Sequence, residues 1–260
     1  MRTPKLGQHF LTHAWAARKL AYAAAPREGE TILEIGPGKG VLTKELLALG
    51  NVVAIEKDEQ LVARLKETFA SEIGSGRLKL VEADVRDVTP ERLGLQKYIL
   101  SANIPYYITG EIIRQFLTAD VQPRAMALLV QKEVARRIVD TKESILSISV
   151  KAFGTPKIIA KVGKSHFSPP PSVDSAIFLI DNISKNFFAD ISEENFFAIV
   201  RAGFASKRKK LVNNLSAISK KEEVLLAFQT CSISESARAE NLNLEQWKCL
   251  ALNENFLPSS

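Results

Sequence analysis

The chain has 260 residues, 46% hydrophobic and 25% charged, a composition typical of a globular protein with a substantial core. No apolar run approaches the roughly eighteen residues of a membrane-spanning helix, and residues 1–11 lack the apolar segment of a signal peptide. We therefore expect a cytoplasmic protein with no membrane partner, and the net charge of +6 favours a polyanionic partner such as nucleic acid.

Strand-like apolar runs alternate with helical patterns in the first half of the chain. Thr12 is the expected N-cap of a first helix that ends near residue 25. The strand-like runs are 31–36, 51–56, 78–84, 98–103 and 126–130, and helical patterns cover 41–49, 58–70, 109–117 and 131–139. This alternation predicts βαβ units, and hence an α/β fold with a parallel sheet covered on both faces.

The second half changes character. A helical pattern at 145–153 precedes two strand-like runs, 157–162 and 175–180, which we expect to finish the sheet as a hairpin-like pair. Beyond residue 181 the patterns are helical only: 193–203, 207–216, 220–229 and 244–252. We therefore expect a ligand-binding α/β domain over 1–182 and a small α-helical, RNA-binding domain over 183–260.

The cysteines and histidines are few and scattered. Cys231 and Cys249 are the two cysteines, and the three histidines form no cluster with them. This spacing argues against a metal site and against a disulfide framework, and predicts ordinary buried cysteines in a reducing compartment.

The run at 98–103 ends abruptly in Asn103-Ile104-Pro105-Tyr106. Pro105 has no N–H and a fixed φ, so the strand cannot continue, and residues just past a parallel strand line the ligand crevice. The Asn103 side-chain oxygen and the Ile104 carbonyl suit the two hydrogens of a purine amine, and Tyr106 suits stacking on the base, worth about 1–3 kcal/mol. The alternative is a plain turn that contains a buried tyrosine.

A glycine turn, Glu34-Ile35-Gly36-Pro37-Gly38-Lys39-Gly40, follows the first strand-like run, and Glu56 lies twenty positions past Gly36. Such turns bring backbone close to a ligand, and an acid at this distance binds ribose hydroxyls. The nicotinamide fingerprint G-x-G-x-x-G fails because position 41 is Val41. The pattern instead fits a nucleoside without a pyrophosphate, such as S-adenosylmethionine, unless the turn is merely structural.

Two further positions complete the candidate site. Asp84 ends the third strand-like run, where it either accepts from the ligand's adenine amine or caps a turn. The stiff run of prolines at 169–171 follows Phe167, which we expect to face Tyr106 so that a base extruded from RNA lies between two rings. The alternative is a rigid loop with a core phenylalanine.

Basic residues cluster twice. One cluster is the run Lys207, Arg208, Lys209 and Lys210; the other, along a predicted helix, is Lys132, Arg136 and Arg137. The run is either a phosphate-binding surface for RNA or simply a solvated helix face.

Taken together, these stretches resemble the KsgA family of small-subunit ribosomal RNA adenine N6,N6-dimethyltransferases. The resemblance runs from Leu6 to about Leu215 and its ordered motifs are highly specific. They lie at 7–11, 34–40, 56, 82–84, 103–107, 167–175 and 207–215.

The resemblance implies a class I methyltransferase fold, with a seven-stranded sheet whose last strand is antiparallel, plus a helical C-terminal domain. It implies S-adenosylmethionine as methyl donor, with no metal. Two adjacent adenines near the 3′ end of small-subunit rRNA would each receive two methyl groups. We expect the partner to be small-subunit rRNA within a pre-30S particle, and the protein to be a monomer with a role in ribosome biogenesis.

The resemblance also implies residue roles. The donor would be bound by His9 and Leu11 from the N-terminal segment, by Gly36 and Gly38, by Glu56 at the ribose and by Asp84 at the adenine amine. Asn103 would lie between donor and target. Family members often have Asn where this chain has His9, so a contact through its backbone and one through its side chain both stay open.

Two alternatives remain. The first is an adenine methyltransferase of the antibiotic-resistance type, which acts on large-subunit rRNA and shares the donor site and the Asn-Ile-Pro-Tyr turn. Tyr107, the proline run and the stretch 207–215 favour the small-subunit family. The second is a non-catalytic ribosome-assembly factor, which would be expected to lose the glycine turn, Asn103 or Tyr106.

Overall fold

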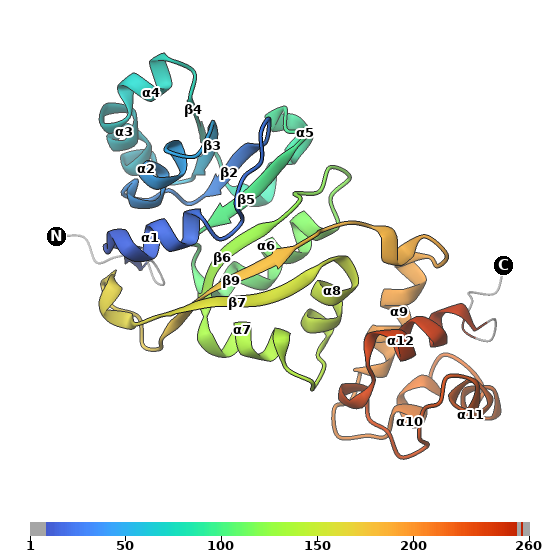
Figure 1. Cartoon of the computed structure of the whole chain (residues 1–260). Coiled ribbons are helices and arrows are strands. Elements are labelled where there is room, and N and C mark those ends of the chain that lie inside the picture. The colour runs from blue at the N-terminus through green and yellow to red at the C-terminus, as the bar shows by residue number, and fades with distance from the viewer. Residues whose placement is uncertain (1–8, 254–255, 257–260) are drawn as a thin grey trace. The chain divides into compact units, whose positions relative to one another are not determined.

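The structure is a computed structural model, and it describes residues 9–253 and 256. These residues form two compact units: an α/β unit of residues 9–136 and 154–183, and a helical unit of residues 137–153, 184–253 and 256 (Figure 1). These units differ from the expected division at 182/183 in two respects. Residues 137–153, expected in the first domain, belong to the helical unit, and Ile183, expected in the second domain, belongs to the α/β unit.

Seven strands of the α/β unit form one sheet in the order β4-β3-β2-β5-β6-β9-β7. They are β2 (Thr31–Ile35), β3 (Val52–Glu56), β4 (Leu78–Glu82), β5 (Tyr98–Ala102), β6 (Met126–Gln131), β7 (Thr155–Val162) and β9 (Ser175–Asp181). β9 is antiparallel to both β6 and β7, and the other neighbouring pairs are parallel. The predicted sheet with an antiparallel last strand, and the hairpin-like pairing of the last two strands, are confirmed.

The strand order reverses direction at β2, the starting strand, which pairs with β3 on one side and β5 on the other. Ligands bind where strand order reverses, outside the carboxyl ends of the strands. The glycine turn after β2 and the Asn103 turn after β5 consequently meet: a Cβ on Gly36 would lie 3.8 Å from the Asn103 carbonyl oxygen.

The helices of the α/β unit are α1 (Ala14–Ala21), α2 (Val41–Leu47), α3 (Glu59–Thr68), α4 (Ala70–Gly74), α5 (Pro90–Leu93) and α6 (Thr109–Leu117), with 3-10 turns at Val85–Asp87, Tyr106–Ile108 and Lys164–His166. The chain leaves the α/β unit and enters the helical unit within α7 (Lys132–Val139), between Arg136 and Arg137. Thr12 is not the N-cap of α1, which follows His13, because its hydroxyl donates instead to the His166 carbonyl at 3.0 Å.

Two very short strands were not predicted. β1 (Phe10–Leu11) pairs antiparallel with β8 (Phe167–Ser168), so that Leu11 lies opposite Phe167. Both side chains are buried in the core of the α/β unit. This pairing places the N-terminal segment beside the proline-rich segment, although more than 150 residues separate them in the sequence.

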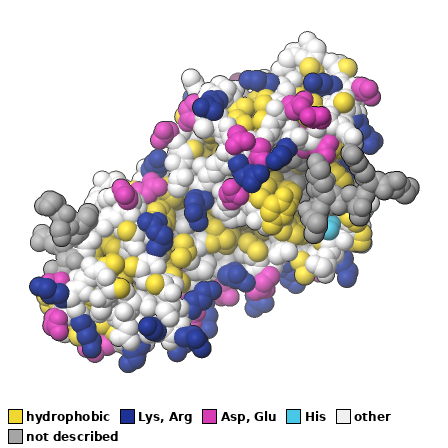
Figure 2. All heavy atoms as spheres, turned by 180° about the vertical axis from the view of Figure 1, so that it is seen from behind, with side chains coloured by type: hydrophobic (Ala, Val, Ile, Leu, Met, Phe, Trp, Pro, Cys, Tyr) yellow, Lys and Arg dark blue, Asp and Glu magenta, His cyan; other side chains and the backbone are white. Residues whose placement is uncertain are grey.

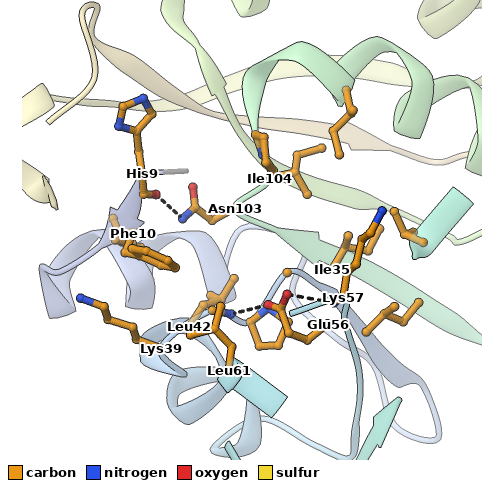
Figure 3. Close-up of a pocket in the computed structure, with 18 of the residues that line it drawn as sticks. His9, Phe10, Ile35, Lys39, Leu42, Glu56, Lys57, Leu61, Asn103 and Ile104 are labelled. Carbon is orange, nitrogen blue, oxygen red and sulfur yellow. Dashed lines mark hydrogen bonds between the residues drawn. The ribbon is translucent and has the colours of Figure 1, made fainter. Parts of the chain in front are cut away.

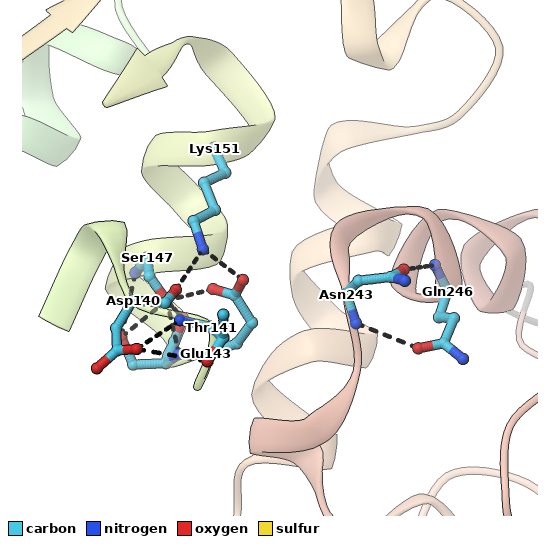
Figure 4. A network of polar contacts seen from close by, with 8 residues as sticks. Asp140, Thr141, Glu143, Ser147, Lys151, Asn243 and Gln246 are labelled. Carbon is cyan, nitrogen blue, oxygen red and sulfur yellow. Dashed lines mark hydrogen bonds and ion pairs between the residues drawn. The ribbon is translucent and has the colours of Figure 1, made fainter. Parts of the chain in front are cut away.

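The helical unit contains α8 (Ile145–Phe153), α9 (Glu193–Gly203), α10 (Leu211–Leu215), α11 (Lys221–Thr230) and α12 (Leu244–Leu252), with 3-10 turns at Asn186–Phe188 and Ala239–Asn241. Ile148 of α8 is buried in the same core as Phe196, Phe228 and Trp247, which explains why residues 137–153 belong here. In Figure 4 the Lys151 ammonium lies 2.9 Å from the Asp140 carbonyl and 2.5 Å from the Glu143 carboxylate, closing the turn that precedes α8.

Two expectations for the helical unit were wrong. The helix predicted over 207–216 begins only at Leu211, so the basic run lies in the loop between α9 and α10. Cys231 and Cys249 are not separate thiols but form a disulfide, with their Cα atoms 5.7 Å apart. Spacing in the sequence did not reveal this, because the end of α11 and the middle of α12 approach only in the folded unit.

No helix in the part of the chain that the structure describes is both long enough and apolar enough to span a membrane.

Candidate active site

A pocket opens at the carboxyl edge of β2, β3 and β5 in the α/β unit (Figure 3). Its walls come from the N-terminal segment, the glycine turn, the ends of β3 and β4, and the turn after β5. Nearly every predicted site residue lines it: His9, Leu11, Gly36, Gly38, Glu56, Asp84, Asn103, Ile104 and Tyr106. Of the residues predicted to bind the donor or the target base, Phe167 is the one that does not line it.

Position 38 requires a glycine because of its backbone conformation and the ring that packs against it. Its φ of +57° favours glycine, and a Cβ there would lie 3.0 Å from the Phe10 ring. Its N–H donates to Glu56 Oε2 at 3.1 Å. The glycine turn is thus held between β1 and the end of β3, with backbone lining the pocket.

Glu56 is buried at the end of β3, where its carboxylate accepts three backbone hydrogen bonds. Besides Gly38, the donors are the N–H groups of Lys57 at 2.9 Å and Asp58 at 3.0 Å, both to Oε1. A carboxylate has about four acceptor positions, so one on Oε2 remains for a ligand hydroxyl. Asp58 also caps α3, as predicted, by accepting from the N–H groups of Gln60 and Leu61.

Asp84 is paired with two cations. The Arg86 guanidinium binds both carboxylate oxygens, at 3.0 and 2.6 Å, and Lys57 Nζ lies 2.7 Å from Oδ2. The hydrogen bonds from Arg86, joined by Lys57, hold the pKa of Asp84 far below its usual range, so the group is a carboxylate at any pH of interest. Its Oδ1 also accepts the Arg86 N–H, capping the turn at Val85–Asp87. The predicted turn cap is thus confirmed, and the contact with the ligand's adenine amine stays a prediction.

Asn103 is oriented by the N-terminal segment. Its amide nitrogen donates to the His9 backbone oxygen at 3.2 Å (Figure 3). An amide that donates through nitrogen on one side presents its oxygen on the other. Among residues 9–253 and 256, none donates a hydrogen bond to Asn103 Oδ1, which can therefore accept one in the pocket.

Tyr106 is anchored through its hydroxyl, which lies 2.6 Å from the hydroxyl of the fully buried Ser175. Burial raises the pKa of Tyr106, and the Ser175 hydrogen bond opposes this shift. The ring that stacks on Tyr106 is that of His9, with centroids 5.9 Å apart and planes 28° apart. Phe167 is only 4% exposed and packs in the core, which matches the alternative interpretation of that residue.

Sequence reasoning missed four residues of this site. Phe10 covers Gly38, Ser175 anchors Tyr106, and Lys57 and Arg86 neutralise Asp84. Phe10 and Ser175 lie inside the motifs discussed above, and the two cations directly follow Glu56 or closely follow Asp84. Their roles depend on side-chain directions that the sequence does not show.

The predicted RNA-binding run, Lys207 to Lys210, is exposed in the loop between α9 and α10. The buried Asn214 side chain shapes this loop by donating to the carbonyls of Gly203 at 2.6 Å and Ser206 at 3.0 Å. On the face in Figure 2, acidic side chains lie among the basic ones. Lys132, Arg136 and Arg137 are also exposed, on α7.

Comparisons with known sequences identify the family. The model of the "Ribosomal RNA adenine dimethylase" family matches residues 2–253. A "Ribosomal RNA small subunit methyltransferase A" of Dehalococcoides mccartyi is 40% identical over 255 residues, covering 95% of this chain and 86% of that protein. The protein of the same name from Thermosynechococcus vestitus is 35% identical, covering 96% and 95%.

Comparisons with solved structures give the same fold. A dimethyladenosine transferase from Plasmodium falciparum is 27% identical with a TM-score of 0.79, covering 93% of this chain and 96% of that one. The 23S rRNA methyltransferase ErmE is 25% identical with a TM-score of 0.76, covering 93% and 97%. The sheet is that of class I S-adenosylmethionine-dependent methyltransferases, as predicted. With this fold, this pocket and a family match over nearly its whole length, the chain belongs to the ribosomal RNA adenine dimethylase family.

Proposed function

We propose that the protein methylates N6 of two adjacent adenines near the 3′ end of small-subunit rRNA, giving N6,N6-dimethyladenine, with S-adenosylmethionine as donor. It acts in the cytoplasm, as a monomer and without a metal, on rRNA within a pre-30S particle during ribosome biogenesis. The observation that carries the proposal is Asn103, which lines the pocket beside the glycine turn; its amide nitrogen donates to the His9 carbonyl, and its oxygen accepts no hydrogen bond from the residues that the structure describes.

The pocket fits a nucleoside donor. The free acceptor position of Glu56 Oε2 suits a ribose hydroxyl, and the glycine turn lets backbone approach the ligand closely. S-adenosylmethionine supplies an electrophilic methyl group on a sulfonium. The protein's part is to bind it by Glu56, Asp84, the glycine turn and the segment from His9 to Leu11.

Asp84 binds the adenine amine of the donor when that amine replaces one of the hydrogen-bond donors that the carboxylate has now. Its carboxylate accepts four hydrogen bonds from Lys57 and Arg86, which fills its acceptor positions. The Lys57 side chain is 69% exposed and reaches Asp84 through a single ammonium group, so it is the donor that moves into solvent when the amine arrives.

The reaction needs orientation more than acid–base chemistry. The target N6 lone pair is delocalised into the purine ring, and acceptors at the Asn103 side-chain oxygen and the Ile104 carbonyl hold its two hydrogens and favour a pyramidal nitrogen. The N6–methyl bond forms as the sulfur–methyl bond breaks, and the displaced proton leaves N6 for water. Holding the reactants in line supplies the main acceleration.

Relatives support the small subunit as target. Proteins named as small-subunit methyltransferases match at 34–40% identity, whereas the 23S enzyme matches at 25%. The resistance-type alternative is accordingly the less favoured of the two rRNA substrates.

The test is methyl transfer from labelled S-adenosylmethionine to undermethylated small subunits and, separately, to large subunits. We expect N6,N6-dimethyladenosine in small-subunit rRNA, and a loss of about a hundredfold in rate for Asn103→Ala. Asn186→Ala, an exposed asparagine outside the pocket, is the matched control. Label in large subunits alone would identify the resistance-type activity. Donor binding without transfer to either would point to an assembly factor.

A further inference from the structure

One face of α1 is exposed and carries both aromatic and basic side chains. Residues three and four positions apart lie on the same face of a helix, and the side chains on this face are Trp15, Arg18, Lys19 and Tyr22. The opposite face consists of alanines and Leu20, and it is buried in the core of the α/β unit. The packing of α1 therefore uses its small residues and leaves its large ones in solvent.

Exposed aromatic rings are few in this protein. Rings bury large apolar areas when they pack in a core, so rings that stay together in solvent mark a candidate binding surface. Among residues 9–253 and 256, three tryptophan, tyrosine or phenylalanine side chains are exposed. Tyr107 lines the pocket, whereas Trp15, 48% exposed, and Tyr22, 55% exposed, both lie on α1. The fold itself does not require these two rings.

The first turn of α1 is fixed close to the pocket. Leu11 lines the pocket, and the N–H and hydroxyl of Thr12 both donate to the His166 carbonyl, at 2.9 and 3.0 Å. In Figure 1 the blue α1 accordingly lies beside the yellow segment that contains His166. The His166 ring lies at a tilt to those of His13 and Trp15, with centroids 4.7 and 5.9 Å away. Trp15 is thus supported on one side and exposed on the other.

The charge of this face suits a polyanion. In the described part of the chain, Lys19 is exposed and belongs to no ion pair. Arg18 Nε lies 3.1 Å from Glu45 Oε2, but 67% of the Arg18 side chain is exposed, against 15% for Glu45. Cations between exposed rings are the combination that binds single-stranded nucleic acid, because phosphates pair with the cations while bases stack on the rings.

The spacing of the rings fits successive stretches of one strand. Trp15 and Tyr22 are seven residues apart, or about 10 Å along the helix axis. This exceeds the roughly 3.4 Å between neighbouring nucleotides of a helical strand, so each ring stacks on a different base. A duplex hides the faces of its bases within its own stack, and this face would therefore prefer unpaired RNA.

We infer that the exposed face of α1 binds a single-stranded segment of the RNA substrate next to the target adenines, with bases stacked on Trp15 and Tyr22 and a phosphate bound by Lys19. The inference rests on the proposed function, because that function supplies the RNA. A second copy of the chain is the less favoured occupant, since two cations lie between the rings and would repel the same face of a partner molecule.

The two tryptophans provide a direct readout. Trp247 is fully buried, so quenching of tryptophan fluorescence by acrylamide reports mainly on Trp15. The probe is a short single-stranded fragment of the small-subunit rRNA 3′ region, compared with the same sequence paired to its complement. We expect the single strand to quench Trp15 fluorescence and to protect Trp15 from acrylamide, and the duplex to do neither at the same concentration.

Substitutions on α1 then separate stacking from general RNA binding. Trp15→Ala and Tyr22→Ala should each weaken the Kd of the labelled single strand about tenfold, equivalent to about 1.4 kcal/mol, as expected for one stacked base. Trp15→Phe keeps a ring and should stay within threefold. Leu226→Ala, at a 58% exposed position of α11, is the matched control for a lost exposed side chain. The Kd of S-adenosylmethionine should stay within twofold throughout, while KM for small subunits rises in Trp15→Ala.

Three results would overturn the inference: no protection of Trp15 by the single strand, equal affinity for the single strand and the duplex, or equal effects of Trp15→Ala and Leu226→Ala. Protection of Trp15 by a rise in protein concentration, without RNA, would assign the face to a second copy of the chain. Failure of the proposed function looks different, since the unaltered protein would then not methylate small subunits. Trp15 fluorescence would still show whether α1 binds single-stranded RNA.

Discussion

At the scale of single residues, Glu34 combines complete burial with an ionisable group. It lies on β2, directly before the glycine turn, and no part of it is exposed. Burial raises the pKa of Glu34 to about 8; the Thr43 hydroxyl opposes this shift and the nearby Glu56 adds to it. The carboxyl is therefore mostly protonated at pH 7 in the folded protein.

This burial predicts a pH-dependent stability. The folded pKa lies above the unfolded value of about 4.3, so between these values the folded state holds a proton that the unfolded state releases. Glu34 thus makes stability fall as pH rises from about 5 to about 8, by up to about 1.4 kcal/mol per pH unit.

Glu34→Gln removes the titrating group at nearly constant size. Urea unfolding across this pH range should show a shallower fall in the free energy of unfolding for the variant than for the unaltered protein. Glu59→Gln, at an exposed position of α3, is the control and should follow the original curve. Parallel curves for Glu34→Gln and the unaltered protein would contradict the prediction.

The sequence predicted which residues line the pocket better than it predicted which aromatic ring lies against Tyr106. Gly38, Glu56, Asp84 and Asn103 follow strand ends, and parallel strand ends converge on one edge, so their gathering is predictable. The aromatic ring that lies beside Tyr106 cannot be predicted in this way. Whether His9 or Phe167 faces it depends on the pairing of β1 with β8, which no local pattern encodes.

At the scale of elements, regular and well-buried segments were predicted best. α6, α8, α9 and α12 match their expected bounds, and the strands of the sheet agree within two residues. β1 and β8 were missed because two residues carry no periodicity and each exists only through its distant partner. The basic run was predicted to be part of a helix over 207–216, but α10 starts only where apolar residues reach the core.

That loop position leads to a prediction for RNA binding. Lys207 and Lys209 are exposed, so replacing both with Gln leaves the core of the helical unit intact. If they bind phosphates, affinity for small-subunit rRNA falls at low salt. The slope of log K against log salt also becomes shallower, by about 0.7–0.9 for each phosphate that the variant no longer neutralises.

The measurement is rRNA binding by filter retention or anisotropy at several salt concentrations. Lys221→Gln, an exposed lysine of α11, supplies a control with a smaller change of charge. An unchanged slope for Lys207→Gln with Lys209→Gln would show that the loop is only a solvated surface.

At the scale of the whole chain, the two units each have their own hydrophobic core, but they are not two continuous stretches of sequence. Residues 137–153 continue the strand–helix alternation and carry no composition change that marks a boundary. Their place is decided by Ile148 and Ala152, which are buried with the C-terminal helices. Partition of a chain between cores depends on such tertiary packing, so linear patterns did not reveal it.

The disulfide of the helical unit gives the last prediction. Cys231 ends α11 and Cys249 lies in α12, 18 positions apart, so the bond closes a loop that joins two helices of one core. In the chain-entropy account, closing a loop of about this length stabilises the folded state by about 3 kcal/mol. A cytoplasmic reductant would remove this contribution.

Thiol titration and thermal unfolding, with and without reductant, test this directly. The oxidised protein should show no reactive thiol and a higher unfolding midpoint than the reduced one. The double variant Cys231→Ser with Cys249→Ser should have the same unfolding midpoint as the reduced protein, and reductant should not change it. Two titrating thiols in the folded, unreduced protein would contradict the bond. Because the pocket residues belong to the α/β unit, reduction should lower stability while leaving the Kd of S-adenosylmethionine unchanged.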